Sequence, residues 1–197
     1  MKFKMKFKKE SKEVLYSTEK NITLNKSFLP FLIKESKKNP KKIIRLCTHK
    51  NKKSPVHEMF IVQPKSYFCK PHKHSGEESM SVIKGRGDVV LFKDNGNIMK
   101  IIEMGDIGSN KVHYYKLSRN IFHILIIKSK YIYFHEVAKG PFKKSNMKSP
   151  PWAPGENVEK INLFKKKLKR DVSIFKKRYK GNNKLIKWKK IPYLKTS

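Results

Sequence analysis

The chain has 197 residues, which allows one sizeable hydrophobic core and is short for two full domains. Its 48 Lys and Arg residues outnumber the 15 Asp and Glu residues and give a formal net charge of +33, a field that attracts polyanions. Because lysine is spread from end to end and lacks the planar fork with which arginine reads bases, we favour a compositional bias and do not expect specific nucleic-acid binding.

The first 42 residues are predicted to precede a β-rich region. Residues 13–18 are typical of a short strand. Ser27 is a suitable N-cap for a helix that continues to Lys38, because its hydroxyl can accept a hydrogen bond from a free amide of the first turn. Asn39 and Pro40 end this helix, since proline disfavours the helical conformation of the residue before it.

Residues 43–155 are predicted to form the main domain, because β-branched and aromatic residues recur in short segments separated by turn signals. The segment at 94–97 has the composition of a hairpin turn. Such a series of strands favours a mainly β, jelly-roll barrel. Predicted strands cover residues 79–83, 88–92, 114–117, 121–128 and 131–137, and residues 140–154 are expected to be irregular.

Residues 156–197 are predicted to form a basic C-terminal extension. Gly155 to Ser197 contains 15 basic and 3 acidic residues and no histidine. Over residues 157–179, apolar side chains recur at steps of three and four, which indicates an amphipathic helix. Two uses of its apolar stripe stay open: packing on protein, including a second copy in a homodimer, and contact with an anionic membrane. Residues 185–194 are expected to add a strand or to stay irregular.

The pair His72 and His74 is the most informative feature of the sequence. On a strand, residues i and i+2 share a face, so both imidazoles point to one side while Lys73 points to the other. The short polar segment at 75–77 allows a turn that brings Glu78 back beside them. Imidazole and carboxylate are ligands for divalent transition metals, so this spacing predicts part of a metal site.

Several blocks of the sequence resemble a known family. His72, His74, Glu78 and Gly85 follow the order and spacing of the first motif of the cupin superfamily. Over roughly residues 27–156, further blocks are similar to the WbuC-like cupin-fold metalloproteins. These blocks are Arg45-Leu46-Cys47-Thr48-His49, Val56-His57-Glu58-Met59, Pro71-His72-Lys73-His74, Phe134-His135-Glu136, Gly140-Pro141-Phe142 and Trp152-Ala153-Pro154.

The resemblance implies a cupin double-stranded β-helix that holds one divalent metal ion, either Fe, Mn, Ni or Zn. The implied ligands are His72, His74, Glu78 and His123. It also implies that three further side chains lie in the pocket around the metal, namely Arg45, His49 and Glu136.

The second cupin motif, which contains His123, departs from the usual pattern. Ser118 and Asn120 stand where Pro and Gly are usual, and Ile127 replaces the final Asn. In the first motif, Ser66 stands at the opening Gly. Because Asn tolerates a positive φ, the turn before His123 is expected to survive.

The family resemblance implies a role near surface-polysaccharide (O-antigen) biosynthesis, with a sugar or nucleotide-sugar as the small-molecule ligand. A basic protein suits an anionic sugar of this kind. Two alternatives stay open: an Fe(II)-dependent dioxygenase acting on a small organic substrate, and a non-catalytic, metal-stabilised binding module. The sequence identifies no catalytic acid or base, so an isomerase or epimerase activity stays open as well.

No apolar run in the sequence approaches the length of a membrane span, and residues 1–9 lack the uninterrupted apolar segment of a secretory signal. We therefore expect a soluble, cytoplasmic protein whose cysteines, Cys47 and Cys69, remain reduced. Cys69 has the opposite strand parity to His72, so we expect it to point away from the metal as a structural thiol.

Overall fold

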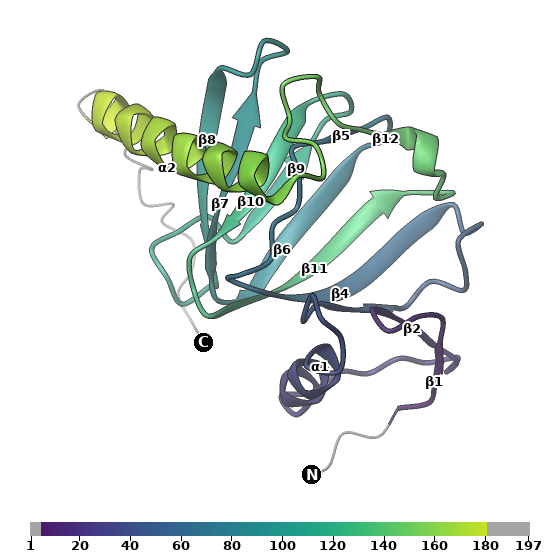
Figure 1. The fold of residues 1–197 in the computed structure, drawn as a ribbon. Coiled ribbons are helices and arrows are strands. Elements are labelled where there is room, and N and C mark those ends of the chain that lie inside the picture. Colours follow the sequence, from purple (N-terminus) through teal and green to yellow (C-terminus); the bar gives the residue numbers. More distant parts are fainter. Residues whose placement is uncertain (1–4, 181–197) are drawn as a thin grey trace, which may run out of the picture. The chain divides into compact units, whose positions relative to one another are not determined.

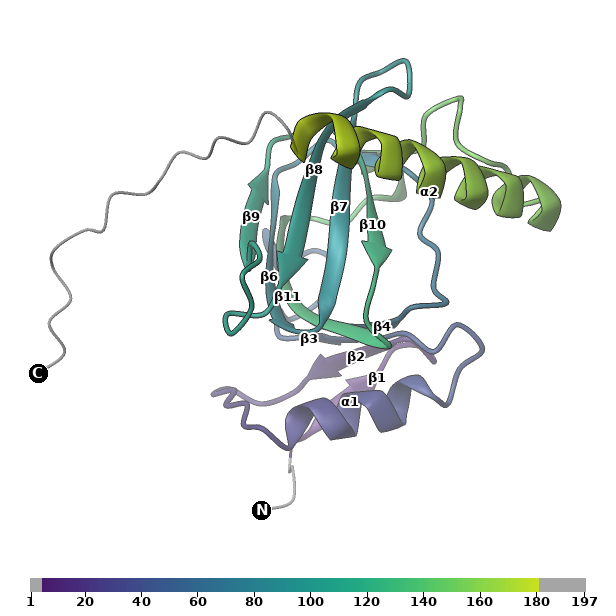
Figure 2. The ribbon, with the colours of Figure 1, turned by 90° about the vertical axis from the view of Figure 1, so that its left-hand side faces the viewer.

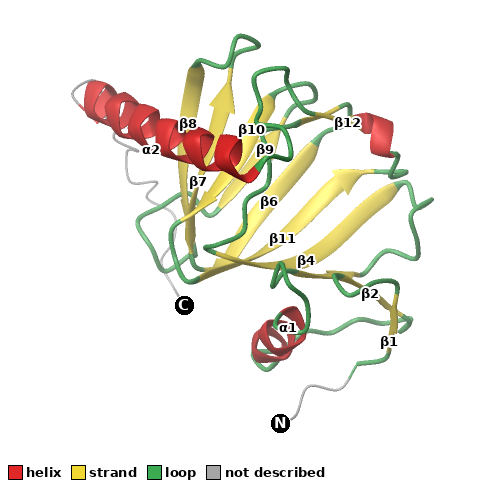
Figure 3. Cartoon of the chain, viewed as in Figure 1, coloured by secondary structure: helices red, strands yellow, loops and turns green. Residues whose placement is uncertain are grey.

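A computed structural model describes residues 5–180. The chain divides into two compact units, Met1–Ala153 and Pro154–Ser197, and each is described by itself. The elements of the first unit (Figure 1; Figure 3) are β1 (Phe7–Lys9), β2 (Val14–Ser17), α1 (Phe28–Ser36), β3 (Ile44–Cys47), β4 (Val56–Pro64), β5 (Lys73–His74), β6 (Glu78–Lys84), β7 (Arg86–Phe92), β8 (Ile98–Gly105), β9 (Tyr114–Leu117), β10 (Phe122–Ile127), β11 (Tyr131–Lys139), the 3-10 helix η1 (Lys144–Asn146) and β12 (Met147–Lys148).

Two sheets pack face to face in the first unit, as the two views of Figure 1 and Figure 2 show. The larger sheet has the strand order β1-β2-β3-β4-β11-β6-β9, and the smaller has the order β10-β7-β8. All pairs are antiparallel except β2 with β3. The non-consecutive order places β11, near the end of the unit, between β4 and β6. The predicted mainly β jelly roll is therefore confirmed.

Alternation along the central strands divides their apolar side chains between two cores. Ile61 of β4 and Phe134 of β11 belong to the core between the two sheets. Their neighbours Val62 and Tyr133 belong to a second core, in which the fully buried Leu32 of α1 packs on the outer face of the larger sheet. The inner face is thus left to line the interior of the barrel.

The predicted N-terminal helix is present as α1, but its predicted cap bond is not. Ser27 precedes the helix and makes no side-chain capping bond. Its hydroxyl donates instead to the Asn25 side-chain oxygen at 2.5 Å. After the helix, Asn39 is buried, and its side-chain amide donates to the carbonyl oxygens of Lys12 and Ile43 at 3.1 and 2.7 Å.

The second unit contains α2 (Val158–Lys180), which matches the predicted amphipathic helix closely. An ion pair one turn apart, between Lys167 and Asp171 at 2.8 Å, supports this helix. The strand suggested at 185–194 lies outside the described residues. Among the helices of residues 5–180, none is long and apolar enough to cross a membrane.

Candidate metal centre

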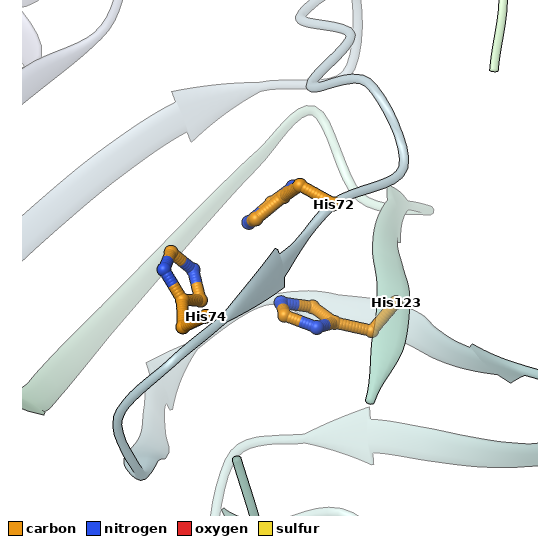
Figure 4. A group of neighbouring side chains, drawn as sticks. All are labelled: His72, His74 and His123. Atoms are coloured by element: carbon orange, nitrogen blue, oxygen red, sulfur yellow. The ribbon is translucent and has the colours of Figure 1, made fainter. Parts of the chain in front are cut away.

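Three histidines from two parts of the chain converge inside the first unit. His72 directly precedes β5, His74 ends β5, and His123 lies in β10. The amide of His72 donates to the carbonyl of His123 at 3.1 Å, and the amide of His123 donates back to the carbonyl of His72 at 2.8 Å. Figure 4 shows the three rings turned toward one another, and one ring nitrogen of each lies within 4.8 Å of the others.

Backbone carbonyls fix the protonation of two of these rings. His72 Nδ1 lies 2.8 Å from the carbonyl oxygen of Lys70, and His123 Nδ1 lies 3.0 Å from that of Ile121. A carbonyl only accepts hydrogen bonds, so in both neutral rings Nδ1 carries the proton and Nε2 presents its lone pair. This arrangement orients a metal-binding imidazole and selects its tautomer.

Glu78 completes the group from the first residue of β6. One carboxylate oxygen lies 3.1 Å from His123 Nε2, and the other lies 3.3 Å from His74 Nε2. The side chain is buried, and the hydroxyl of Tyr115 donates to it at 3.5 Å. Three clustered imidazoles and a carboxylate in contact with two of them, His74 and His123, form a donor set that Fe, Mn, Ni and Zn accept.

The electrostatics of the group favour the forms that bind metal. Burial lowers the pKa of His74 to about 4, so this ring is neutral at pH 7. Burial of Glu78 opposes its ionisation, but a His123 ring protonated on Nε2 as well donates to the carboxylate, and its hydrogen bond and charge hold the pKa of Glu78 below its ordinary value; a metal cation in place of that proton would act in the same direction. Metal ligation requires a neutral imidazole and an ionised carboxylate, so these residues fit a divalent cation.

The histidine group opens into a pocket of about 620 Å³. All seven site residues predicted from the sequence line this pocket: Arg45, His49, His72, His74, Glu78, His123 and Glu136. They come from β3, β5, β6, β10 and β11 and from the segments that flank β3 and β5. The pocket has the size of a small-molecule site.

Glu136 is a charged side chain on the inner face of β11. It is paired with Met59 of β4 and Met80 of β6, whose side chains are apolar. Burial, followed by the negative charge of Glu78, raises the pKa of Glu136 to about 7, and the charge of Arg45 opposes the shift. A carboxylate in this position costs folding free energy, which makes it a candidate for a functional role.

His49 lies in the same pocket beside a second imidazole. Its ring stacks on that of His57, with 4.1 Å between centroids and 20° between planes. His49 Nδ1 lies 3.0 Å from both the amide nitrogen and the carbonyl oxygen of Glu58, so the backbone of Glu58 holds this ring nitrogen in either tautomer. The other ring nitrogen, Nε2, is buried and has no hydrogen-bond partner within residues 5–180.

Cys69 was expected to point away from the metal, and the group of described residues that could hold one does not include it, but the strand parity behind this expectation does not hold. Its sulfur lies 3.7 Å from His72 Nδ1, and the residue lines the pocket. The parity argument fails because β5 covers only Lys73–His74, so residues 68–71 are not a regular strand. Both cysteines are free, and burial raises the pKa of each thiol, with that of Cys47 reaching about 12.

The turn before His123 agrees with the prediction from the sequence, and two further side chains, His135 and Tyr115, can be placed from strand alternation. Asn120 has φ +64°, so the turn before His123 is made with the positive φ expected of it. His135 points to the outer face, where Nε2 lies 3.0 Å from the Glu58 carboxylate and the ring stacks on Phe60. Sequence reasoning did not identify Tyr115 as a site residue, although the alternation of β9 places it on the same face as the buried Leu117.

Comparisons with known proteins give limited further information. A family model described as a domain of unknown function, DUF6016, matches residues 24–104. A search of curated proteins gave no match.

Three solved structures that resemble the chain are a protein from Shewanella oneidensis, oxalate decarboxylase from Bacillus subtilis and procruciferin, an 11S globulin, from Brassica napus. Their identities are 6%, 16% and 10%, with TM-scores of 0.43, 0.40 and 0.38. The matches cover 52%, 48% and 48% of this chain, and 66%, 24% and 22% of those chains. The chain thus spans less than two thirds of each of these proteins, and the fold assignment rests on the strand order and register described above.

Proposed function

We propose that the protein binds one divalent transition metal on His72, His74, Glu78 and His123 and uses it to hold a small molecule in the adjoining pocket. The observation that carries this proposal is the convergence of three imidazoles and one carboxylate from separate elements. Without a bound cation, such a group places four polar side chains inside a barrel at a cost in folding free energy. A bound cation offsets that cost.

The surroundings of the cluster support a site that binds a ligand. His72, His74, Glu78 and His123 would hold the metal, which would supply Lewis-acid chemistry to an oxygen of the ligand. The pocket beside the cluster has room for a small molecule, and Lys139 and Lys143 add positive charge to its lining. The ligand we propose is a sugar or nucleotide-sugar, in a setting of surface-polysaccharide biosynthesis that the WbuC-like blocks of the sequence suggest.

Metal analysis of purified protein tests the proposal directly. We expect about one Fe, Mn, Ni or Zn per chain by elemental analysis, and its loss in a His72→Ala/His74→Ala double variant. The matched control is His113→Ala/His135→Ala, because His113 is exposed and the His135 ring lies on the outer face of the sheet. Stoichiometric metal in the first double variant, or equal loss in both, contradicts the assignment.

A further inference from the structure

The pocket contains a carboxylate, that of Glu136, to which residues 5–180 donate no hydrogen bond. Glu136 lies in the middle of the inner face of β11, flanked in register by Met59 and Met80. Within residues 5–180 its carboxylate makes no hydrogen bond or ion pair. A partly buried carboxylate requires hydrogen-bond donors, so a ligand that covers Glu136 has to supply them. A phosphate or a second carboxylate at this point would be repelled.

The next row of the sheet leaves room for such a ligand. Ala138 is paired with His57 on one side and with Glu78 on the other. Adjacent strands are about 4.8 Å apart, so the Cα atoms of His57 and Glu78 are separated by about 10 Å. Between them on this face the sheet presents only the methyl group of Ala138. The floor of the pocket is therefore low between the histidine cluster and the stacked His49–His57 pair.

The groups around this low floor differ in hydrogen-bonding character. Glu136 accepts hydrogen bonds, and the buried His49 Nε2 has no hydrogen-bond partner among the described residues, so it takes a group that can donate or accept. At the edge of the pocket the exposed ring of Phe142 lies 6.5 Å from that of His57 and offers an apolar surface. A ring that bears several hydroxyl groups meets all three requirements, because a hydroxyl both donates and accepts, and the C–H face of the ring packs on an aromatic side chain.

We propose that Glu136 is the residue that recognises the hydroxyl groups of a neutral, polyhydroxylated ring bound over Ala138. This inference rests on the proposed function, in which another oxygen of the same ligand reaches the metal beside Glu78. It makes Glu136 a specificity-determining residue: neutral sugar rings are accepted, and rings that direct a carboxylate at this point are rejected. A phosphate-bearing part of the ligand then lies toward the lysines of the pocket lining, away from Glu136.

Titration calorimetry with defined probes tests the inference. The probes are UDP-glucose, UDP-galactose, UDP-glucuronate and UDP alone, each added to metal-loaded wild-type protein, to Glu136→Gln and to Glu58→Gln. Glu58 is the matched control, because its carboxylate lies on the outer face of the same sheet beside His135. We expect at least one neutral sugar nucleotide to bind more tightly than UDP. In Glu136→Gln this gain in affinity over UDP should fall about 10- to 100-fold, the range for a hydrogen bond to a charged group.

The same titrations define the results that overturn the inference. UDP-glucuronate should bind more weakly than the neutral sugars to the wild type and should lose this disadvantage in Glu136→Gln. No gain of either neutral sugar over UDP, an unchanged gain in Glu136→Gln, or an equal loss in Glu58→Gln contradicts the role of Glu136. An Ala138→Leu variant, which fills the floor of the pocket, should lose the sugar-dependent gain and keep its metal, and an unchanged gain there also contradicts the inference.

Metal content, measured on each sample, separates the two proposals. Wild-type protein that binds no metal contradicts the proposed function, whatever the titrations show. Protein that holds its metal but selects sugars independently of Glu136 contradicts this inference alone.

Discussion

Replacing Glu136 by glutamine should remove a pH-dependent loss of stability from the metal-free protein. Burial and the charge of Glu78 raise the pKa of Glu136 from 4.5 to about 7 in the folded state. Between these two values the unfolded chain has released this proton while the folded chain retains it, so the free energy of unfolding falls as the pH rises from about 4.5 to about 7. The upward shift of the Glu136 pKa corresponds to a loss of roughly 3 kcal/mol at most in the free energy of unfolding.

Urea denaturation at pH 5 and pH 8 in the presence of a chelator measures this effect. The wild type should lose up to about 2.5 kcal/mol more than Glu136→Gln over that interval, whereas Glu58→Gln should follow the wild type. A divalent cation favours the ionised carboxylate, so metal-loaded wild type should show a smaller loss. Parallel pH profiles of metal-free wild type and Glu136→Gln would refute the reasoning, because the carboxylate would then titrate alike in the folded and unfolded chains.

Three further results are expected. Metal content after dialysis should fall below about pH 6, where ordinary imidazoles take up protons, although burial keeps the pKa of His74 near 4; full occupancy at pH 4 would argue against imidazole ligands. Leu32→Ala should lower the free energy of unfolding by about 2–5 kcal/mol, because Leu32 is fully buried in the core beneath α1; a loss below about 1 kcal/mol would contradict that packing. Truncation after Gly155 should leave the metal content unchanged and abolish any salt-sensitive binding to anionic vesicles, since each Lys or Arg near such a surface contributes about 1 kcal/mol; a folded, truncated protein without metal would show that the extension organises the site.

The strands could be predicted from the sequence because their side chains alternate between two different environments. In β11, Phe134 faces the core between the sheets, and Tyr133 faces the core beneath α1. Alternation of this kind fixes which residues share a face, so Glu136 could be placed with Phe134 before the strand order was known, whereas Ala138 lies one residue beyond the predicted end of this strand. The strand order itself was not predictable from alternation, because the pairing of β11 with both β4 and β6 joins segments far apart in the chain.

The errors occurred where the backbone is irregular. The parity rule failed for Cys69 because residues 68–71 do not form a regular strand, so alternation does not determine where its side chain points. The capping rule failed for Ser27 because its backbone is in the helical region, with φ −77° and ψ −9°, whereas a capping side chain reaches the first-turn amides from a non-helical conformation. Both errors concern contacts that depend on local backbone geometry, which composition does not determine.

The inner face of the larger sheet shows how the fold and the site constrain each other. Since α1 covers the outer face with its own apolar core, the inner face has to supply the remaining core as well as the pocket lining. Ile61, Phe134 and Val82 fill the inner row next to the smaller sheet, whereas the next two rows contain Glu136 and Ala138. A sequence selected for packing alone would place larger apolar side chains at both positions, because an unpaired carboxylate and an unfilled space each lower stability. That both departures lie beside the histidine cluster is the physical reason to read the pocket as a binding site.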